Sequence, residues 1–384
     1  MENIYLPDYH GGSIVNLMSS IAHAFNAKHP YPELRALSSS EIKKSKNVIL
    51  LVVDGMGYEQ LVSRNLFLKH NIKSKITSVF PSTTAAGITA FMTGVPVQQH
   101  GLSAWFVFLK EIGILSKILP FNPRMGGPSF TETGYNMKDF LQAPSLMNSL
   151  RAKSYVFWNE EVVNSSYSRA SAGKAKRIAY KDLNDFFNKL EKITKKKEKK
   201  YIFAYWPFLD AYAHDYGVGS KKYEQHFKKL DKKIKIFLEK IKGTNTQVII
   251  TADHGQINGT KNKMIWLKDY SKITECLTLP FAGEGRVPFC YVHPSKASEF
   301  ENYVKTHLGK YCTLHKSEEL IKKNFFGLGP ANNKLFDRVG DYILIMKENY
   351  ILRDWMENKN EQNRGHHGGV SKEEMFVPLI VFRR

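Results

Sequence analysis

The chain has 384 residues, of which 42% are hydrophobic and 24% are charged, and its net charge is +20. This size allows a large buried core, in one big domain or in a domain with an insertion. The segment Met1–Pro7 lacks a basic start followed by an apolar stretch, and apolar runs such as Val48–Val53 are far shorter than the ~20 residues of a membrane span. We therefore expect a soluble, cytoplasmic protein without a membrane span, with export by a dedicated machine left open.

Much of the positive charge is local, in Lys195–Lys200, at the end of an amphipathic helical pattern. The simplest interpretation is a solvated helix end. Contact with nucleic acid or an anionic surface is the alternative, although no nucleic-acid-binding motif supports it. The three cysteines are odd in number and widely spaced, which excludes a disulfide framework and a CxxC metal pair: Cys276, Cys290 and Cys312.

Apolar, β-branched runs alternate with helical patterns along the chain. This alternation predicts an α/β fold with a mostly parallel central sheet covered by helices on both faces. The predicted strands are Asn47–Val53, Ser154–Trp158, Tyr201–Trp206, Gln247–Thr251 and Phe376–Phe382. The predicted helices are Ser13–Asn26, Thr84–Met92, Met137–Ser149, Tyr180–Thr194 and Tyr223–Lys242.

Two regions depart from this alternation. Residues 107–136 are interrupted by Gly and Pro, which predicts a long loop. Residues 277–352 predict a small inserted α+β subdomain, and the catalytic domain is then made of residues 1–276 and 353–384. The subdomain has a predicted strand, helix, strand, helix and strand at Val287–Val292, Ala297–Leu308, Tyr311–His315, Ser317–Asn324 and Tyr342–Lys347.

Asp and His residues follow the predicted strands at four places along the chain. Open α/β sheets bind ligands just beyond the carboxyl ends of their strands, so these residues could meet at one edge of the sheet. Three aspartates, three histidines and a hydroxyl would suit two zinc-like ions with N and O ligands. The residues are Asp54, Asp210, His214, Asp253, His254, His367 and Thr84. Each could instead be a turn, a helix cap or a surface residue, and the argument depends on their combination.

The order of these segments resembles the alkaline phosphatase superfamily and, within it, the type I phosphodiesterase/nucleotide pyrophosphatase branch. The matching segments are Val53–Gly57, Phe80–Thr84 with Met92–Gly94 and His100–Gly101, Asp210–His214, Thr251–Gly255, and His367–Gly369. The resemblance implies that Asp54, Asp253, His254 and Thr84 line one metal, and that Asp210, His214 and His367 hold the other, with His366 less favoured for the last place. Thr84 would be the nucleophile, activated by a metal and forming a phospho-threonine.

Two departures bear on the substrate. Trp105 stands where nucleotide-cleaving relatives carry an Asn that holds a phosphate oxygen, and it is either a wall of the substrate site or a core residue. The segment from Gly368 to Leu379 is similar to cofactor-independent phosphoglycerate mutases, which use Ser as nucleophile. Monoesterases of the superfamily add a positive group, and Arg124 and Arg286 are candidates for it, although each could be an ordinary surface arginine.

The resemblance implies hydrolysis of a phosphodiester or pyrophosphate, in a nucleotide or related small phosphate ester, with zinc as the expected metal and manganese as the alternative. A phosphomonoesterase or phosphomutase is the second hypothesis. A basic binding protein that keeps the fold without turnover is the third. The sequence leaves the physiological substrate and the oligomeric state open.

Overall fold

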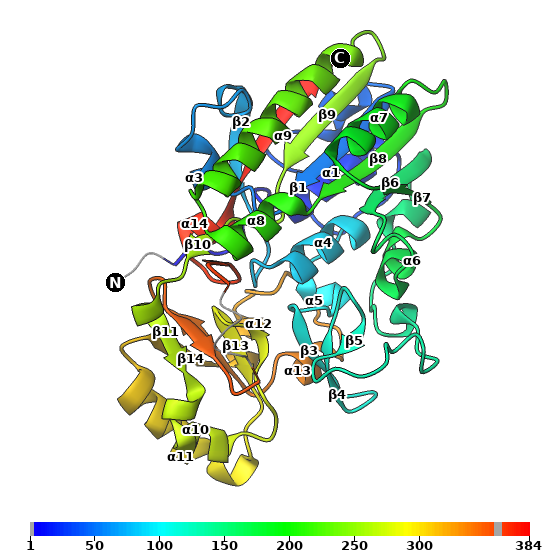
Figure 1. Ribbon diagram of the computed structural model, residues 1–384. Helices are drawn as coiled ribbons and strands as arrows, with labels where there is room; N and C mark the ends of the chain where they lie inside the picture. Colours follow the sequence, from blue (N-terminus) through cyan, green and yellow to red (C-terminus); the bar gives the residue numbers. More distant parts are fainter. Residues whose placement is uncertain (1–3, 357–362) are drawn as a thin grey trace.

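A computed structural model describes residues 4–356 and 363–384 of the chain. Its main part is a seven-stranded sheet in the order β2-β18-β9-β1-β8-β6-β7 (Figure 1). Six strands run in one direction, and β18 is antiparallel to both of its neighbours. The mostly parallel sheet is confirmed, and so are its five predicted strands, to within one residue at each end. The strands are β1 (Asn47–Val53), β2 (Ile72–Thr77), β6 (Lys153–Asn159), β7 (Lys176–Tyr180), β8 (Lys200–Trp206), β9 (Thr246–Thr251) and β18 (Phe376–Arg383).

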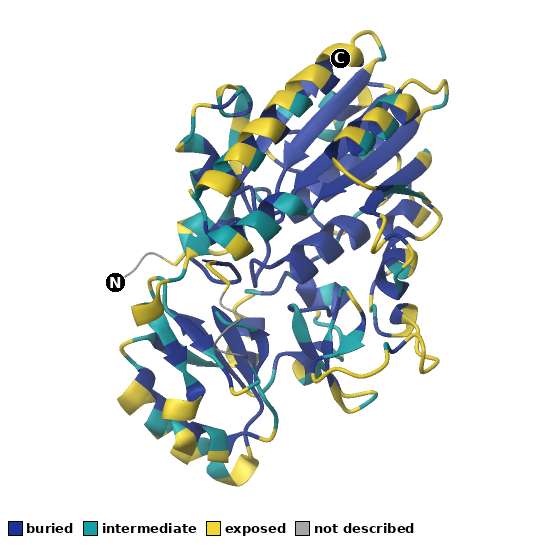
Figure 2. Cartoon of the chain, in the orientation of Figure 1, coloured by how far each residue is buried: buried dark blue, intermediate teal, exposed yellow. Residues whose placement is uncertain are grey.

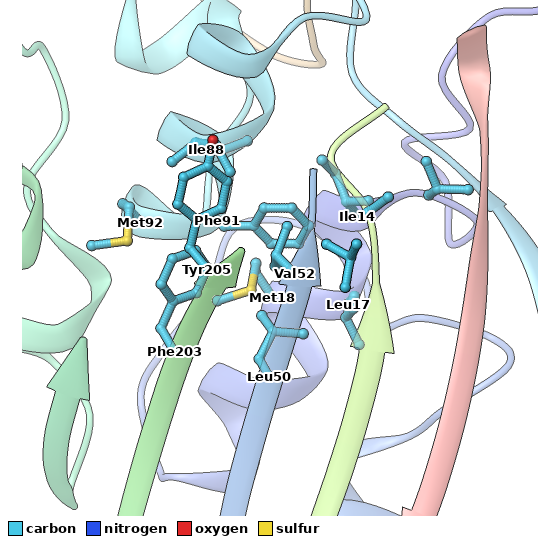
Figure 3. Close-up of a cluster of buried hydrophobic side chains, with 14 of the residues drawn as sticks. Ile14, Leu17, Met18, Leu50, Val52, Ile88, Phe91, Met92, Phe203 and Tyr205 are labelled. Atoms are coloured by element: carbon cyan, nitrogen blue, oxygen red, sulfur yellow. The ribbon is translucent and has the colours of Figure 1, made fainter. Parts of the chain in front are cut away.

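The central strand β1 is apolar after its first residue because the sheet and its helices cover it on all sides. All of its residues are buried, and it pairs in parallel with β8 and β9. Helices α1 (Ile14–Ala24) and α4 (Thr84–Thr93) pack together on one face, where Met18 and Phe91 contact the layer formed by Leu50 and Val52 (Figure 3). Burial of each such side chain contributes about 1.5–3 kcal/mol.

Helices α7 (Leu183–Thr194) and α9 (Lys221–Lys240) pack together on the other face. Their outer sides are exposed and the strands beneath them are buried (Figure 2). The Asp182 side chain accepts hydrogen bonds from the backbone of Asn184 and Asp185 and so caps α7, which explains why this helix begins later than predicted.

The helix predicted over Met137–Ser149 is wrong. The structure has two short 3-10 turns there, η2 (Met137–Asp139) and η3 (Leu146–Asn148). Pro144 lies between them, and a proline inside a helix removes one hydrogen bond and clashes with the preceding turn. The apolar side chains of Met137, Leu146 and Met147 are buried, but Pro144 prevents a continuous helix.

A second seven-stranded sheet lies beside the first, in the order β14-β15-β13-β12-β3-β4-β5. The prediction of a loop over residues 107–136 is therefore wrong in part, because this stretch supplies strands to the sheet of the inserted region. A single register pair, Gly283 with Phe106, joins the two groups of strands. The strands are β3 (Phe106–Leu109), β4 (Ile114–Lys117), β5 (Asn122–Pro123), β12 (Ala282–Glu284), β13 (Val287–Cys290), β14 (Cys312–Lys316) and β15 (Tyr342–Met346).

The inserted region has a hydrophobic cluster of its own, which extends from Ile265 to Leu352. The three cysteines lie here, buried and free of disulfides. The boundaries at residues 277 and 352 stay a prediction. The helices of this region are α10 (Ser271–Cys276), α11 (Ala297–Tyr303), η7 (Val304–Leu308) and α12 (Ser317–Lys322), and β11 (Met264–Trp266) pairs with β16 (Ile351–Arg353).

The other short elements connect these layers. They are α2 (Ser39–Lys43), α3 (Tyr58–Val62), η1 (Lys69–Asn71), α5 (Val97–His100), α6 (Ser166–Ala172), α8 (Phe208–Tyr216), β10 (Ile257–Asn258), η4 (Lys261–Lys263), η5 (Leu267–Asp269), η6 (Pro294–Lys296), α13 (Leu335–Arg338), β17 (Gly365–His366) and α14 (Lys372–Met375). Among the residues that the structure describes, no helix has the length and apolar character needed to cross a bilayer.

Candidate active site

The sheet order explains how distant residues come together. Strands β9, β1 and β8 are neighbours, and each is followed at its carboxyl end by acidic residues. Asp54 follows β1, Asp253 and His254 follow β9, and α8 after β8 carries Asp210 and His214. Short strand β17 carries the chain to His367, and the first residue of α4 is Thr84. The structure thus brings all seven residues singled out in the sequence to one edge of the sheet.

The first cluster surrounds Nε2 of His254. This nitrogen lies 3.1 Å from Oγ1 of Thr84, 3.3 Å from Oδ1 of Asp54 and 3.6 Å from Oδ2 of Asp253. All four side chains are buried. The carboxylates and the imidazole offer atoms close enough to share one cation.

One oxygen of each carboxylate in this cluster is held and the other is not. Asp54 Oδ2 accepts a hydrogen bond from the hydroxyl of Tyr205, and Asp253 Oδ1 accepts from the backbone N–H of His254 at 3.0 Å. Within residues 4–356 and 363–384, Asp54 Oδ1 and Asp253 Oδ2 are buried without a hydrogen-bond partner. Such orphaned oxygens are costly unless a cation binds them, so the site fits a metal.

The electrostatics support the same conclusion. Burial raises the pKa of Asp54 well above its usual range, and the charges of Asp253 and Asp210 raise it further. Burial also raises the pKa of Asp253, although neighbouring His254 opposes this. A divalent cation would offset the repulsion between these carboxylates and restore their ionised forms.

The second cluster is built on Asp210. Its Oδ2 lies 3.2 Å from Nε2 of His214, and its Oδ1 lies 4.0 Å from Nε2 of His367. Asp210, His254 and His367 also offer atoms close enough to share one cation, and the rings of His254 and His367 stack 3.9 Å apart. His366 was less favoured from the sequence. Its Nε2 lies 2.9 Å from the backbone oxygen of Asn363.

Backbone carbonyls orient two of the histidines. Nδ1 of His214 contacts the carbonyl of Gly365 at 2.8 Å, and Nδ1 of His254 contacts that of Gly255 at 3.0 Å. Such contacts fix the tautomer and aim Nε2 at the carboxylates, as is usual for histidines that bind metals. Burial lowers the pKa of His214, but the Asp210 carboxylate has the larger combined effect and raises it to about 9.

Three supporting residues were not identified from the sequence. Tyr205 donates to Asp54, Gln256 donates through Nε2 to Oδ1 of Asp210, and Glu374 Oε1 accepts from the backbone N–H of Gly369 at 2.9 Å. Gln256 follows Asp253-His254-Gly255 directly, which is the one local signal that could have indicated it. Tyr205 lies 151 residues from Asp54, and Glu374, although only five residues from Gly369, also binds Arg286, which is 88 residues away.

A cavity of about 380 Å³ opens above these clusters. Residues of the second sheet form its other wall together with Trp105, which directly precedes β3. Trp105 is half-buried, and its backbone N–H lies 2.9 Å from Oε1 of Glu284. Of the two interpretations left open by the sequence, lining of the site describes Trp105 better than a place in the core. Glu284 was not identified from the sequence.

The two arginines considered as phosphate-binding groups also line the cavity, but both are engaged. Arg124 forms a buried ion pair with Asp354, at 2.8 Å. Arg286 donates from Nε and Nη2 to the two oxygens of Glu374, at 3.0 Å each. Neither guanidinium is an uncompensated positive charge facing the nucleophile.

Comparison with known proteins identifies the family. The model of the family described as type I phosphodiesterase/nucleotide pyrophosphatase matches residues 48–370. No curated protein matches the chain. Solved structures with a similar fold include murine ectonucleotide pyrophosphatase/phosphodiesterase 5, with 19% identity, a TM-score of 0.66 and coverage of 86% of this chain and 87% of that one. The human protein of the same name has 17% identity, a TM-score of 0.65 and coverage of 88% and 89%. Phosphonoacetate hydrolase from Sinorhizobium meliloti, in complex with phosphonoformate, has 16% identity, a TM-score of 0.62 and coverage of 88% and 90%.

Proposed function

Because the chain belongs to the type I phosphodiesterase/nucleotide pyrophosphatase family and is thus a phosphohydrolase, we propose that it cleaves phosphodiester or pyrophosphate bonds by transfer of the phosphoryl group to Thr84. The observation that carries this proposal is the position of the Thr84 hydroxyl, 3.1 Å from Nε2 of His254 and at the first residue of α4. The first N–H groups of a helix lack intrahelical partners and can bind phosphate oxygens.

The residues of the two clusters fit two divalent metals, with zinc proposed first and manganese second. Asp54, Asp253 and His254 would hold one ion together with Thr84. Asp210, His214 and His367 would hold the other. Zinc suits these N and O donors, and when bound it would lower the pKa of a coordinated hydroxyl or water and neutralise charge on the leaving oxygen. The chain's own contribution is to aim the Thr84 hydroxyl, to hold the phosphoryl group against α4 and to exclude bulk water.

Diesters and pyrophosphates are favoured over monoesters on electrostatic grounds. A monoester carries an additional charge at neutral pH, since its second pKa is about 6. Arg124 and Arg286 are tied up in buried ion pairs, and the carboxylate of Glu284 lies beside Thr83, next to the proposed nucleophile. A nucleotide substrate is supported by a relative with 18% identity, an inactive threonine-to-alanine variant of the murine protein in complex with AMP.

The test compares bis-p-nitrophenyl phosphate with p-nitrophenyl phosphate under added zinc or manganese. Faster cleavage of the diester is expected, and faster cleavage of the monoester would favour a phosphomonoesterase or phosphomutase. Thr84→Ala should lose at least 1,000-fold in kcat, roughly as for other nucleophile removals, while retaining its metals. Thr93→Ala, a buried threonine at the other end of α4, is the matched control and should stay within a few-fold of wild type.

Mass spectrometry of acid-quenched enzyme tests the covalent step. With bis-p-nitrophenyl phosphate, attack by Thr84 releases one p-nitrophenolate, so the peptide that contains Thr84 should carry a p-nitrophenyl phosphoryl group until water hydrolyses it. The absence of this group from a turning-over enzyme would reject the phospho-threonine. A protein with no metal and no turnover would be the basic binding protein of the third hypothesis. The cytoplasmic location and contact of the basic surface with nucleic acid or an anionic membrane stay predictions.

A further inference from the structure

Glu284 is the acidic side chain that the second sheet brings to the nucleophile helix. It ends β12, which pairs with β3 through Gly283 and Phe106, so it lies next to Trp105. Its Oε1 accepts a hydrogen bond from Oγ1 of Thr83 at 2.6 Å and another from the backbone N–H of Trp105 at 2.9 Å. Thr83 precedes Thr84 directly, so this carboxylate is fixed within one residue of the proposed nucleophile.

The backbone of Gly368, which follows His367, packs against the side chain of Glu284. Gly368 adopts a φ of +111°, and a Cβ on it would lie 2.9 Å from Cβ and Cγ of Glu284. Any larger residue at position 368 would push the carboxylate out of place. Glu284 is therefore held by the nucleophile helix, by Trp105 and by the loop of a proposed metal ligand at once, which makes its position a built feature of the site.

The second oxygen of Glu284 faces the cavity. Among the described parts of the chain, Glu284 Oε2 has neither a hydrogen bond nor an ion pair, and the residue lines the cavity together with Thr84, His214 and His367. The guanidinium two residues along the chain does not neutralise it, because Arg286 turns to Glu374. Among the described residues no arginine or lysine forms an ion pair with this carboxylate, which lies at the entrance to the reacting atoms and feels the charges of His214 and His254 only.

We propose that Glu284 is the selectivity determinant of this site, and that its carboxylate repels the second charge of a phosphomonoester and so restricts the enzyme to monoanionic diesters. This rests on the proposed function of Thr84 as the nucleophile. A substrate phosphorus that reaches Thr84 must carry its non-bridging oxygens close to Thr83 and Glu284. The Glu284 carboxylate and the second negative charge of a monoester would then be near neighbours and repel each other. Even at the effective dielectric of a protein surface, this repulsion corresponds to a tenfold or greater change in rate or affinity.

Glu284→Gln tests this charge with little change of shape. The amide oxygen can still accept the hydrogen bonds of Thr83 and Trp105, so the cavity-facing oxygen alone is replaced, by a neutral NH2 group. Glu299→Gln is the matched control, because it removes the same charge from an exposed position on α11 of the inserted region. Burial raises the pKa of Glu284, so the assays are run at about pH 8.5, far above the usual range of a carboxyl group.

The readouts are kcat/KM for bis-p-nitrophenyl phosphate and p-nitrophenyl phosphate, and the dissociation constant of inorganic phosphate with the zinc-loaded protein. In Glu284→Gln, the ratio of monoester to diester kcat/KM should rise at least tenfold and phosphate should bind at least tenfold more tightly. Glu299→Gln should leave both within twofold. Glu284→Met, which removes the charge and both acceptor bonds, should change the ratio in the same direction if the glutamine variant folds poorly.

The outcomes separate the two proposals. A wild-type enzyme that cleaves diesters, together with an unchanged ratio and unchanged phosphate affinity in Glu284→Gln, would overturn the role of Glu284 and leave the proposed function intact. A wild-type enzyme that cleaves no diester would overturn the proposed function. In that case the phosphate dissociation constants still decide whether Glu284 repels dianions at this site.

Discussion

Replacement of Arg286 by Met removes the cation of a buried ion pair between the two sheets. The guanidinium donates to both oxygens of Glu374 at 3.0 Å and through Nη1 to the carbonyl of Tyr350 at 2.6 Å. The two side chains are 2% and 0% exposed. Removal of one partner leaves the other as an unpaired buried charge, so we expect Arg286→Met to lower the free energy of unfolding by about 3–5 kcal/mol. Activity should fall too, because Glu374 also holds Gly369, two residues after His367.

Urea unfolding of the zinc-loaded variants, followed by circular dichroism, measures this effect. The double variant Arg286→Met/Glu374→Met should recover most of the lost stability, since it leaves no unpaired charge and the methionines can fill the space. Lys322→Met removes one partner of an exposed pair with Glu318 and should change stability by less than about 0.5 kcal/mol. The reasoning is refuted if Arg286→Met unfolds within about 1 kcal/mol of wild type, or if the double variant is no more stable than the single one.

Three further predictions concern metal binding and pH. Asp54→Asn should reduce the metal content of the purified protein toward one ion per chain, and elemental analysis that still finds two would count against the ligand set. Tyr205→Phe removes the hydrogen bond to Asp54 and should weaken zinc binding by about 10- to 100-fold in a chelator competition without unfolding the chain; unaltered affinity would contradict this. Burial lowers the pKa of His100 to about 3, so below about pH 6.5 the unfolded chain binds a proton that the folded protein does not. The free energy of unfolding should therefore decrease by up to about 1.4 kcal/mol per pH unit as the pH falls, and urea titrations at pH 7.5 and 5.0 should show a smaller decrease in His100→Asn.

The central sheet could be predicted because its signals are local. Each parallel strand is buried on both faces, and a run such as Asn47–Val53 is therefore apolar without interruption after its first residue. Strands β3 and β4 gave no such signal, because they are only four residues long and stand in a stretch interrupted by Gly and Pro, although they pair with each other as neighbours in the chain. Phe106 meets Gly283 across more than 170 residues, and no pattern within residues 107–136 records that contact.

The candidate site divides in the same way. The residues of the two clusters directly follow strands, begin α4 or lie on the short helix α8 that follows β8, so their motifs could be read from the sequence one by one. Glu284 lies in a segment without a motif, and Glu374 lies in the mutase-like segment, which gave no hint of its role. Both roles follow from contacts with Thr83 and Arg286 that need the folded chain. Gln256 lies between these two cases. It directly follows a motif, but its role in the site is evident only from its hydrogen bond to Asp210.

This division has a consequence for how substitutions should act. The central sheet carries the proposed metal ligands and Thr84, whereas the second sheet carries Trp105 and Glu284 across the same cavity. The polar link between the sheets, Arg286 with Glu374, fixes orientation more than it adds stability, since buried ion pairs are offset by the cost of desolvation. Changes at the ends of β1, β8 and β9 should therefore reduce metal content and kcat together. Changes in β3 and β12 should leave metal content intact and alter the choice between substrates, because they move the wall and not the reacting atoms.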